Sequence, residues 1–192
     1  MQTERQTQII EAALELISEN GIQGCTIKNL SKKIGISEPA IYRHFESKTD
    51  ILLTILNNFN VLAHQIKSKV MKLDRGAYEK IEFMFLKILE MFKTTPSLIS
   101  VIFSEEIFKN EDVLKHKIIN VLDTNKQTIE YILKEGQQKG DVRDDIESAD
   151  LALVVMGALR LLVKQWDLKH QTNDIDAKVH RLLNSIKLII KK

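Results

Sequence analysis

The sequence predicts an all-α protein of about nine helices, with a small N-terminal head and a larger C-terminal helical bundle. Apolar residues recur at helical spacing along most of the chain, and the period-two alternation of half-buried strands does not occur. Only seven glycines and two prolines interrupt the 192 residues, and both prolines fall near expected helix starts. We therefore expect residues 1–47 to form the head and residues 48–192 the bundle. A helix from about residue 48 to residue 70 would link the two.

The charge of the chain is nearly balanced, with 28 lysine and arginine residues against 26 aspartate and glutamate residues. Bulk charge therefore does not indicate a nucleic-acid partner, but residues 24–48 carry five basic side chains against two acidic ones. This local excess favours contact with phosphate. The single Cys25 cannot form an internal disulfide, and no apolar run approaches the roughly 18 residues of a membrane span. We expect a cytoplasmic protein without a membrane segment.

Past a first helix at about residues 3–20, the chain has the signals of a helix-turn-helix. Thr26 can cap a short helix, and Gly35 can end it in the left-handed conformation that glycine adopts at little cost. Ser37 can cap the next short helix, with Pro39 in its first turn, where a missing N–H costs least. The first helix has an apolar face that would cover this motif, so the head is expected to have a three-helix core.

The details of this motif resemble those of one protein family. They are a threonine that opens the first short helix, Gly35-Ile-Ser at the turn, Ile41-Tyr-Arg-His-Phe in the second short helix, and Ser47-Lys-Thr-Asp-Ile-Leu after it. In these features the chain resembles the TetR family of bacterial transcriptional regulators. The matching stretch, with the helix before it, covers a quarter of the chain. Ser31 departs from the small apolar residue usual at its position, and a buried serine can bond back to a helix carbonyl.

The resemblance implies a sequence-specific DNA-binding regulator without enzyme activity, a repressor that a small-molecule inducer releases from a palindromic operator. It also implies phosphate contacts by Tyr42, His44 and Lys48, which lie around the second short helix as polar groups. Thr26 and Lys28 lie on the neighbouring side and suit further contacts with the DNA backbone. An alternative on the same fold is an architectural or division-type DNA-binding factor without an inducer.

Base recognition is expected at the start of the second short helix, because the N-terminal residues of a recognition helix enter the major groove. These residues are Ser37, Glu38, Pro39, Ala40 and Arg43. Glu38 could accept a hydrogen bond from cytosine, and Ala40 could contact a thymine methyl group. Arg43 suits either guanine or a phosphate, and both interpretations remain open.

Six further helices are predicted after the head. Their expected ranges are about 48–70, 77–94, 96–108, 113–136, 147–167 and 175–190. The first of them starts with Ser47 and Asp50 in a capping-box arrangement. At about 1.5 Å per residue it reaches roughly 30 Å, which makes it the only element long enough to touch both the head and the bundle. The segment from Gly136 to Asp145 is polar, contains two glycines and is expected to be a turn.

The last two helices carry more apolar surface than one chain can bury, which predicts a homodimer. Two helices from each copy would form an isologous four-helix contact, as two-fold symmetry requires. The residues expected in this interface are Leu151, Val155, Ala158, Leu159, Leu162, Val179, Leu182, Leu183 and Ile186. Leu153 and Leu161 widen the apolar arc of the eighth helix, so that helix needs cover on more than one side.

A ligand pocket is expected between the long linking helix and the three helices that follow it. From the residues alone a packed core is the simpler interpretation, and the resemblance favours a cavity because TetR-family proteins hold their inducers among these helices. The candidate lining residues are Phe59, Ala63, His64, Phe85, Leu89, Phe103 and Tyr131. They indicate a largely apolar or aromatic effector, with His64 or Tyr131 as its polar anchor.

The sequence has no pattern typical of catalysis or metal binding. It lacks G-x-S-x-G and the glycine-rich loops that bind phosphate. Its five histidines do not have the paired spacing, with a carboxylate, of a helical zinc site. We therefore expect neither an enzyme nor a bound cofactor or metal.

Overall fold

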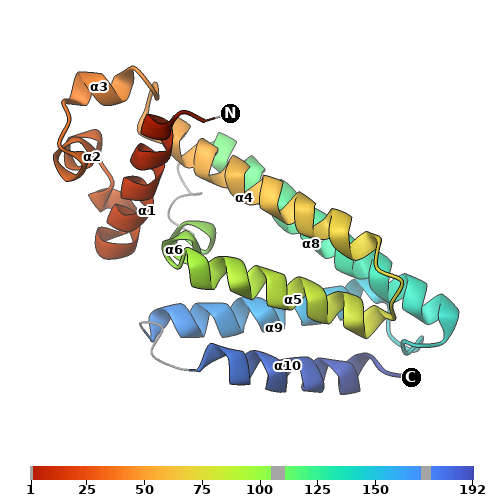
Figure 1. The fold of residues 1–192 in the computed structure, drawn as a ribbon. Helices are drawn as coiled ribbons and strands as arrows, with labels where there is room; N and C mark the ends of the chain where they lie inside the picture. The colour runs from red at the N-terminus through yellow and green to blue at the C-terminus, as the bar shows by residue number, and fades with distance from the viewer. Residues whose placement is uncertain (1, 105–110, 170–173) are drawn as a thin grey trace. The chain divides into compact units, whose positions relative to one another are not determined.

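The computed structural model describes residues 2–104, 111–169 and 174–192. Over these ranges the chain forms nine helices and no β-strand, which confirms the all-α prediction (Figure 1). The helices are α1 (Glu4–Gly24), α2 (Ile27–Ile34), α3 (Glu38–Tyr42), α4 (Lys48–Met71), α5 (Ala77–Thr94), α6 (Ser97–Ile102), α8 (Asp112–Lys139), α9 (Ser148–Leu168) and α10 (Ile175–Ile190). One isolated antiparallel bridge joins Val142 to Lys191.

Most helix ends lie close to their predicted positions, and two differ from them. α1 continues past Gly21, but this residue has φ 67° and breaks the helical backbone where the stop was expected. α8 continues to Lys139, so the predicted turn beginning at Gly136 is wrong at its start. Gly136 lies inside the helix and packs closely on Ala77 and Val142, where a side chain would not fit. Of the predicted helix 96–108, residues 105–108 lie outside the described residues.

The helices group into two compact units by their packing. Unit 1 comprises Met1–Val61 and Thr95–Ile119, and unit 2 comprises Leu62–Thr94 and Asn120–Lys192. Both α4 and α8 therefore contribute residues to each unit, so the prediction that the linking helix alone is long enough to reach both parts is wrong. These ranges differ from the predicted 1–47 and 48–192, because α6 packs on α1 and joins the head. Helical spacing in a sequence does not show which helices pack together, so this contact was not expected.

The helix-turn-helix in unit 1 has the predicted Thr26 cap and the predicted left-handed glycine, but the predicted side-chain cap by Ser37 is wrong. The Thr26 hydroxyl accepts a hydrogen bond from the Asn29 amide at 3.1 Å, which satisfies a free N–H at the start of α2. Gly35 adopts the left-handed conformation, with φ 73° and ψ 34°, directly after α2. Ser37 precedes α3, but its side chain makes no capping hydrogen bond there. The turn geometry is thus set mainly by the cap at Thr26 and the left-handed glycine.

The core of unit 1 ties α1, α2, α3 and the first half of α4 together. Its buried apolar residues are Ile9, Ile10, Ala13, Leu14, Ile17, Leu30, Ile41, Phe45, Ile51, Leu52, Ile55 and Leu56. Ser31 is buried among them, and its hydroxyl donates to the Lys28 carbonyl at 2.9 Å. The departure from the family pattern at Ser31 is therefore satisfied within α2, as predicted.

α4 begins with the capping arrangement that its sequence predicts. The Ser47 hydroxyl accepts from the Asp50 amide at 3.1 Å, and the Glu46 amide donates to the Asp50 carboxylate at 3.2 Å. Two N–H groups near the start of the helix are thereby satisfied reciprocally. This cap fixes the point at which the chain leaves α3 and enters the long helix.

Unit 2 is a bundle in which α10 packs on both α9 and α5 (Figure 1). At one end, Lys93 on α5 and Asp176 on α10 form an ion pair with a nitrogen–oxygen distance of 2.6 Å. Its buried apolar core includes Ile81, Met84, Phe85, Leu89, Phe92, Ile132, Leu133, Leu151, Val155, Val163, Val179, Leu183 and Ile186. The apolar faces predicted on these helices therefore serve first to bury one another within the chain.

An ion pair between a buried lysine and a half-buried glutamate links α5 to α8 in unit 2. Lys80 is 6% exposed, and its ammonium group donates to the Glu135 carboxylate at 2.9 Å. The Lys139 ammonium group donates to the other carboxylate oxygen at 2.6 Å. Lys139 and Lys80 together lower the pKa of Glu135 from 4.5 to about 2. The carboxylate therefore stays ionised well below neutral pH in the folded chain.

We expect this pair to make the folded state sensitive to acid. A carboxyl group whose pKa is lower in the folded state stabilises the fold above its unfolded pKa, and this stability is lost as pH falls toward the folded value. Its loss should therefore extend from about pH 4.5 to about pH 2, since these are the two pKa values. Glu135→Gln should lower the free energy of unfolding near neutral pH and flatten its decline in acid. Urea unfolding across this range checks the expectation, and identical pH profiles for both proteins would contradict it.

None of the helices in the described parts of the chain is both long enough and apolar enough to cross a membrane.

Candidate functional site

α3 presents a polar and partly aromatic face to solvent. Ile41 and Phe45 are buried and anchor the segment on the rest of unit 1. The residues predicted to read bases are Ser37, Glu38, Pro39, Ala40 and Arg43. All of them are exposed except Ala40, which is half-buried. Tyr42 is 52% exposed, an uncommon position for a large aromatic side chain without a partner. The structure thus brings the predicted base-reading residues together on one accessible surface.

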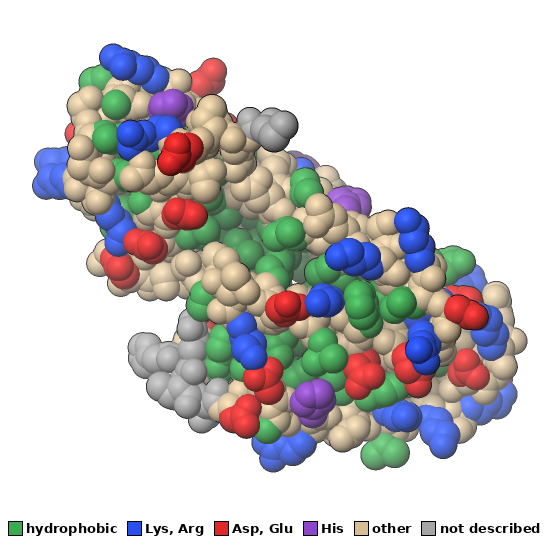
Figure 2. All heavy atoms as spheres, viewed as in Figure 1, with side chains coloured by type: hydrophobic (Ala, Val, Ile, Leu, Met, Phe, Trp, Pro, Cys, Tyr) green, Lys and Arg blue, Asp and Glu red, His purple; other side chains and the backbone are tan. Residues whose placement is uncertain are grey.

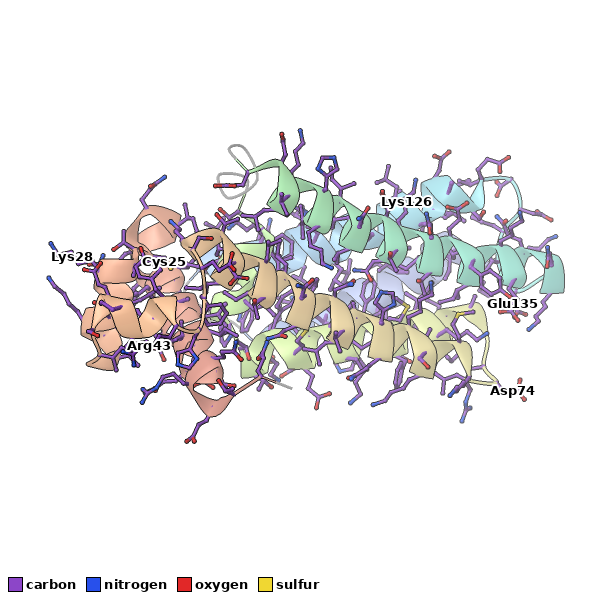
Figure 3. The ribbon with its side chains drawn as sticks, turned by 90° about the horizontal axis from the view of Figure 1, so that it is seen from above. Cys25, Lys28, Arg43, Asp74, Lys126 and Glu135 are labelled. Atoms are coloured by element: carbon purple, nitrogen blue, oxygen red, sulfur yellow. The ribbon has the colours of Figure 1, made fainter. Side chains whose placement is uncertain are left out.

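Basic side chains lie around this face of the head (Figure 2). Figure 3 shows Lys28, on α2, extending outward, and Arg43 at the outer surface beside α3. Both side chains are exposed, as is Thr26 at the start of α2. Exposed cations and hydroxyls at the ends of two adjacent helices are the groups that position a protein on a phosphate backbone.

Lys33 differs from Lys28, although both lie on α2. Its ammonium group forms ion pairs with Glu15 at 3.0 Å and with Glu19 at 3.2 Å, and both partners lie on α1. Hydrogen bonds to Glu15 and then to Glu19 raise the pKa of Lys33. We infer that Lys33 holds α2 on α1, while Lys28 is available for a phosphate.

These two lysines provide a matched pair of substitutions. Lys28→Ala is expected to weaken DNA binding and to reduce the slope of log affinity against log salt by about 0.9, the value for one phosphate contact. Lys33→Ala should leave the salt slope unchanged, because its charge is already paired within the head. Fluorescence anisotropy on operator DNA at several salt concentrations measures both slopes. Equal slopes for wild type and Lys28→Ala would show that Lys28 does not contact phosphate.

Lys48, predicted to contact phosphate, also has a role inside unit 1. Its ammonium group donates to the Ile22 carbonyl at 2.6 Å and so satisfies a carbonyl near the end of α1. It lies close to the buried thiol of Cys25, whose pKa is raised by burial and lowered to a smaller extent by this ammonium group. An ammonium group has three donors, so this bond leaves donors for a phosphate oxygen. The phosphate contact of Lys48 stays a prediction.

His44 lies at the end of the recognition segment and is half-buried. Its backbone carbonyl accepts a hydrogen bond from the Gln6 side chain of α1 at 3.4 Å. Gln6 also completes a capping box with Thr3 at the start of α1. The first turn of α1 therefore holds the end of the recognition segment, a link between two distant stretches that the sequence did not indicate.

α9 has two apolar faces, and the structure separates them. Six of the nine residues predicted for the dimer interface are buried within unit 2: Leu151, Val155, Leu159, Val179, Leu183 and Ile186. The other three, Ala158, Leu162 and Leu182, are half-buried. The exposed apolar side chains of α9 are Leu153 (56%), Val154 (51%), Leu161 (60%) and Leu168 (67%). Val154, Leu161 and Leu168 are spaced by seven residues and lie on one stripe with the exposed Gly157, which we call the α9 stripe.

The residues predicted to line a pocket have different environments. Phe85 and Leu89 are buried on α5 in unit 2, and Phe59 is buried on α4 in unit 1. Ala63 and Phe103 are half-buried. His64 is exposed and Tyr131 is 56% exposed, so both predicted polar anchors lie on the surface of unit 2. The pocket itself stays a prediction.

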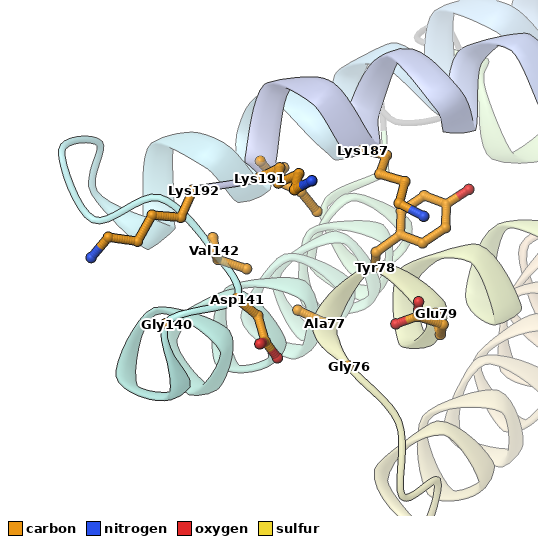
Figure 4. A pocket seen from close by; sticks show the side chains of 11 residues that line it. Gly76, Ala77, Tyr78, Glu79, Gly140, Asp141, Val142, Lys187, Lys191 and Lys192 are labelled. Atoms are coloured by element: carbon orange, nitrogen blue, oxygen red, sulfur yellow. The ribbon is translucent and has the colours of Figure 1, made fainter.

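A cleft of about 470 Å³ lies elsewhere in unit 2, where α5 begins and α10 ends (Figure 4). Its lining includes an apolar floor and charges of both signs: Ala77, Tyr78, Glu79, Asp141, Val142, Lys187, Ile190, Lys191 and Lys192. The Lys187 ammonium group lies 4.5 Å from the centre of the Tyr78 ring, a cation–π distance. None of the predicted pocket residues lines this cleft.

Two family profiles match nearly the whole chain. The one described as "Bacterial regulatory proteins, tetR family" matches residues 9–55. The one described as "YsiA-like protein, C-terminal region" matches residues 56–191, more than half of the chain. The chain belongs to the TetR family. It is therefore a DNA-binding transcriptional regulator, and its resemblance to this family is confirmed.

Individual relatives of this TetR-family regulator support the same assignment. The fatty acid metabolism regulator protein of Bacillus subtilis (strain 168) is 25% identical over 175 residues, covering 88% of this chain and 87% of that protein. The nucleoid occlusion factor SlmA of Vibrio atlanticus (strain LGP32) is 24% identical over 179 residues, covering 90% and 91%. The crystal structure of the transcriptional regulator FadR from Bacillus subtilis in complex with stearoyl-CoA has a TM-score of 0.80 at 23% identity, covering 96% and 98%. The last likeness shows a shared fold.

Sequence reasoning predicted the exposed residues around α3 but missed several of the residues that hold this helix in place. The ion pairs of Lys33 are an example, because Glu15 and Glu19 lie more than ten residues before it and no local pattern connects them. Only part of the α9 stripe was predicted from the sequence. Leu161 was noted as widening the apolar arc, but a helical wheel of α9 cannot tell which of two apolar faces meets its own chain.

Proposed function

We propose that this TetR-family protein is a homodimeric repressor that binds a palindromic operator through α3 and that a fatty acyl-CoA releases it. The observation that carries the proposal is the relationship over the C-terminal part of the chain. The profile at residues 56–191 and the 25% identity to a fatty acid metabolism regulator both span the helices that would hold the effector. The relative crystallised with stearoyl-CoA has the same fold. A long acyl chain also agrees with the apolar effector indicated by the sequence.

Operator recognition rests on the exposed face of α3. Ser37, Glu38 and Pro39 begin this helix and would enter the major groove, with Arg43 one turn further on. Five further residues would hold the head on the flanking phosphates: Thr26, Lys28, Tyr42, His44 and Lys48. The first three are exposed, and the last two are half-buried. In a dimer the two heads must contact successive major grooves about 34–36 Å apart, which makes affinity sensitive to their spacing.

The α9 stripe supports a dimer contact through α9 and α10. Its side chains are apolar and more than half exposed, whereas the opposite face of α9 is already covered by its own chain. Gly157 has no atom within 4 Å of the position that a Cβ would take, so a partner helix could approach the backbone closely at this point. We therefore assign Val154, Gly157, Leu161 and Leu168 to the centre of the interface, with Ala158, Leu162 and Leu182 beside it.

Release from the operator would require the effector to favour a head arrangement that no longer matches two grooves. α4 and α8 each have residues in both units, so two helices connect the head with the effector-binding helices along the chain. A reduction of operator affinity by about 100-fold corresponds to about 2.7 kcal/mol, which lies within the usual range of coupling free energies. The effector must bind the arrangement that no longer matches two grooves more tightly, by this amount, than the arrangement that binds the operator.

The proposal is tested by measuring operator binding with and without acyl-CoA. DNase footprinting on the DNA that flanks the gene would first locate an operator. Fluorescence anisotropy with that DNA should then show about a 100-fold loss of affinity at saturating palmitoyl-CoA or stearoyl-CoA. Free coenzyme A serves as the control and should leave affinity unchanged, because it lacks the apolar chain. Operator affinity indifferent to acyl-CoA of every chain length would reject the effector assignment.

A second candidate function is favoured by the relatives named nucleoid occlusion factor, which are about as similar in identity as the fatty acid regulator. On this alternative the chain is an architectural or division-type DNA-binding factor, and its helical bundle holds no effector. The same titration separates the two functions, because such a factor would keep its operator affinity in the presence of acyl-CoA. The proposal includes a cytoplasmic location and no catalytic activity, in agreement with a family profile described as regulatory proteins and a relative named as a metabolism regulator.

A further inference from the structure

The core of unit 2 contains a polar side-chain atom that has no hydrogen-bond partner in the described part of the chain. Trp166, in the last turn of α9, is 6% exposed, and its indole nitrogen is buried with no hydrogen-bond partner among the described residues. It is the only tryptophan of the chain. Buried indole N–H groups usually find an acceptor, because a donor removed from water without one destabilises the folded state. An orphaned donor of this kind therefore needs an explanation.

The surroundings of Trp166 offer apolar groups. It lies at the end of unit 2 where α5 and α9 end and α10 begins, as the ion pair between Lys93 and Asp176 also indicates (Figure 1). The neighbouring turns of these helices contribute buried apolar residues to the core: Leu89 and Phe92 on α5, Val163 on α9, and Ile175 and Val179 on α10. A ligand suited to this end of the unit would be apolar along most of its length and would carry one hydrogen-bond acceptor.

We propose that the Trp166 indole N–H is the polar anchor of the effector site and donates to the thioester carbonyl oxygen of a bound fatty acyl-CoA. This inference rests on the proposed function and adds the group that recognises the acyl linkage. It also replaces the predicted anchors His64 and Tyr131, which are exposed. The acyl chain would meet the apolar residues of the core, and the indole would recover the hydrogen bond that it lacks in the free chain. The ligand class is a long-chain acyl thioester.

The single tryptophan makes this contact directly observable. A ¹H–¹⁵N spectrum of the labelled protein should contain one indole resonance, whose proton moves downfield when it gains an acceptor. We expect this shift with palmitoyl-CoA. The thioether S-hexadecyl-CoA, which has the same chain length and no carbonyl, should leave the proton near its free position. It should also bind about tenfold more weakly, the loss expected for one hydrogen bond of about 1.4 kcal/mol.

A change of one atom at Trp166 provides the second arm. Biosynthetic replacement of tryptophan by 3-benzothienylalanine keeps the size of the ring and puts sulfur in place of the N–H. The protein with this replacement should then bind palmitoyl-CoA and S-hexadecyl-CoA with equal affinity. A tenfold preference for palmitoyl-CoA that persists after this replacement would overturn the inference. An indole proton already shifted downfield in the free protein would overturn it as well, because the donor would then have a partner without ligand.

Operator binding measured in parallel distinguishes the two levels of the proposal. Palmitoyl-CoA that releases the operator without moving the indole resonance leaves the proposed function intact and rejects Trp166 as the anchor. Palmitoyl-CoA that neither binds nor releases the operator rejects both.

Discussion

Val154→Asp is expected to convert the dimer into a folded monomer and to lower operator affinity by about 100-fold or more. The substitution places a carboxylate within the α9 stripe. Two-fold symmetry places it there twice, once from each copy. Burying charges without partners costs several kcal/mol, and about 2.7 kcal/mol already shifts an equilibrium 100-fold. The monomer should remain folded, because Val154 is 51% exposed in the single chain and a charge there stays in water.

Val61→Asp is the matched control, because Val61 is 55% exposed on α4 and lies outside the α9 stripe. It should remain dimeric. Sedimentation velocity at micromolar concentration gives the oligomeric state of both variants, and circular dichroism confirms that they are folded. A Val154→Asp protein that sediments as the wild-type dimer would show that the interface lies elsewhere. Loss of the dimer in Leu159→Asp would not locate the interface. Leu159 is 7% exposed within its own chain, so a charge there would also disturb the packing of the single chain.

Gly136→Ala is expected to lower the free energy of unfolding by about 2 kcal/mol, although alanine is the better helix former. A methyl group at this position of α8 would lie 2.5 Å from a Val142 methyl carbon and 2.8 Å from the Ala77 Cβ. The Ala77 Cβ is attached directly to the backbone of α5 and cannot rotate away. The two helices must therefore separate, and overpacking of this kind costs typically 1–3 kcal/mol. For a chain of this length the melting temperature should fall by about 4–8 °C.

Gly157→Ala is the corresponding control in another helix. The position that its methyl group would take has no neighbour within 4 Å in the single chain, so the helix gain of about 0.5–1 kcal/mol should appear as increased stability. Both glycine variants are best compared in the Val154→Asp background, where no partner covers α9. Gly136→Ala with wild-type stability there would mean that α5 and α8 are not packed as closely as the structure indicates. A stabilised Gly157→Ala that nevertheless weakens the wild-type dimer would place a partner helix against this residue.

The sequence by itself determined those features of this regulator that depend on a few neighbouring residues. The Thr26 cap, the left-handed Gly35 and the Ser47–Asp50 arrangement are hydrogen bonds and backbone preferences within one or two turns, and all three occur as predicted. Together they place α3 with its polar face outward. The resemblance to the TetR family was carried by the same local pattern, which is why it could be recognised before any packing was known.

The tertiary structure decided which side chains remain available once the helices pack. Lys28 and Lys33 are alike in sequence, but only Lys33 meets two carboxylates from α1. Leu159 and Leu161 are equally apolar, but one is buried in its own chain and the other is 60% exposed. Helical periodicity gives the faces of each helix and not the partner of each face, because that choice depends on all the helices at once. For the same reason, only the packed core shows that the Trp166 indole has no hydrogen-bond partner among the described residues.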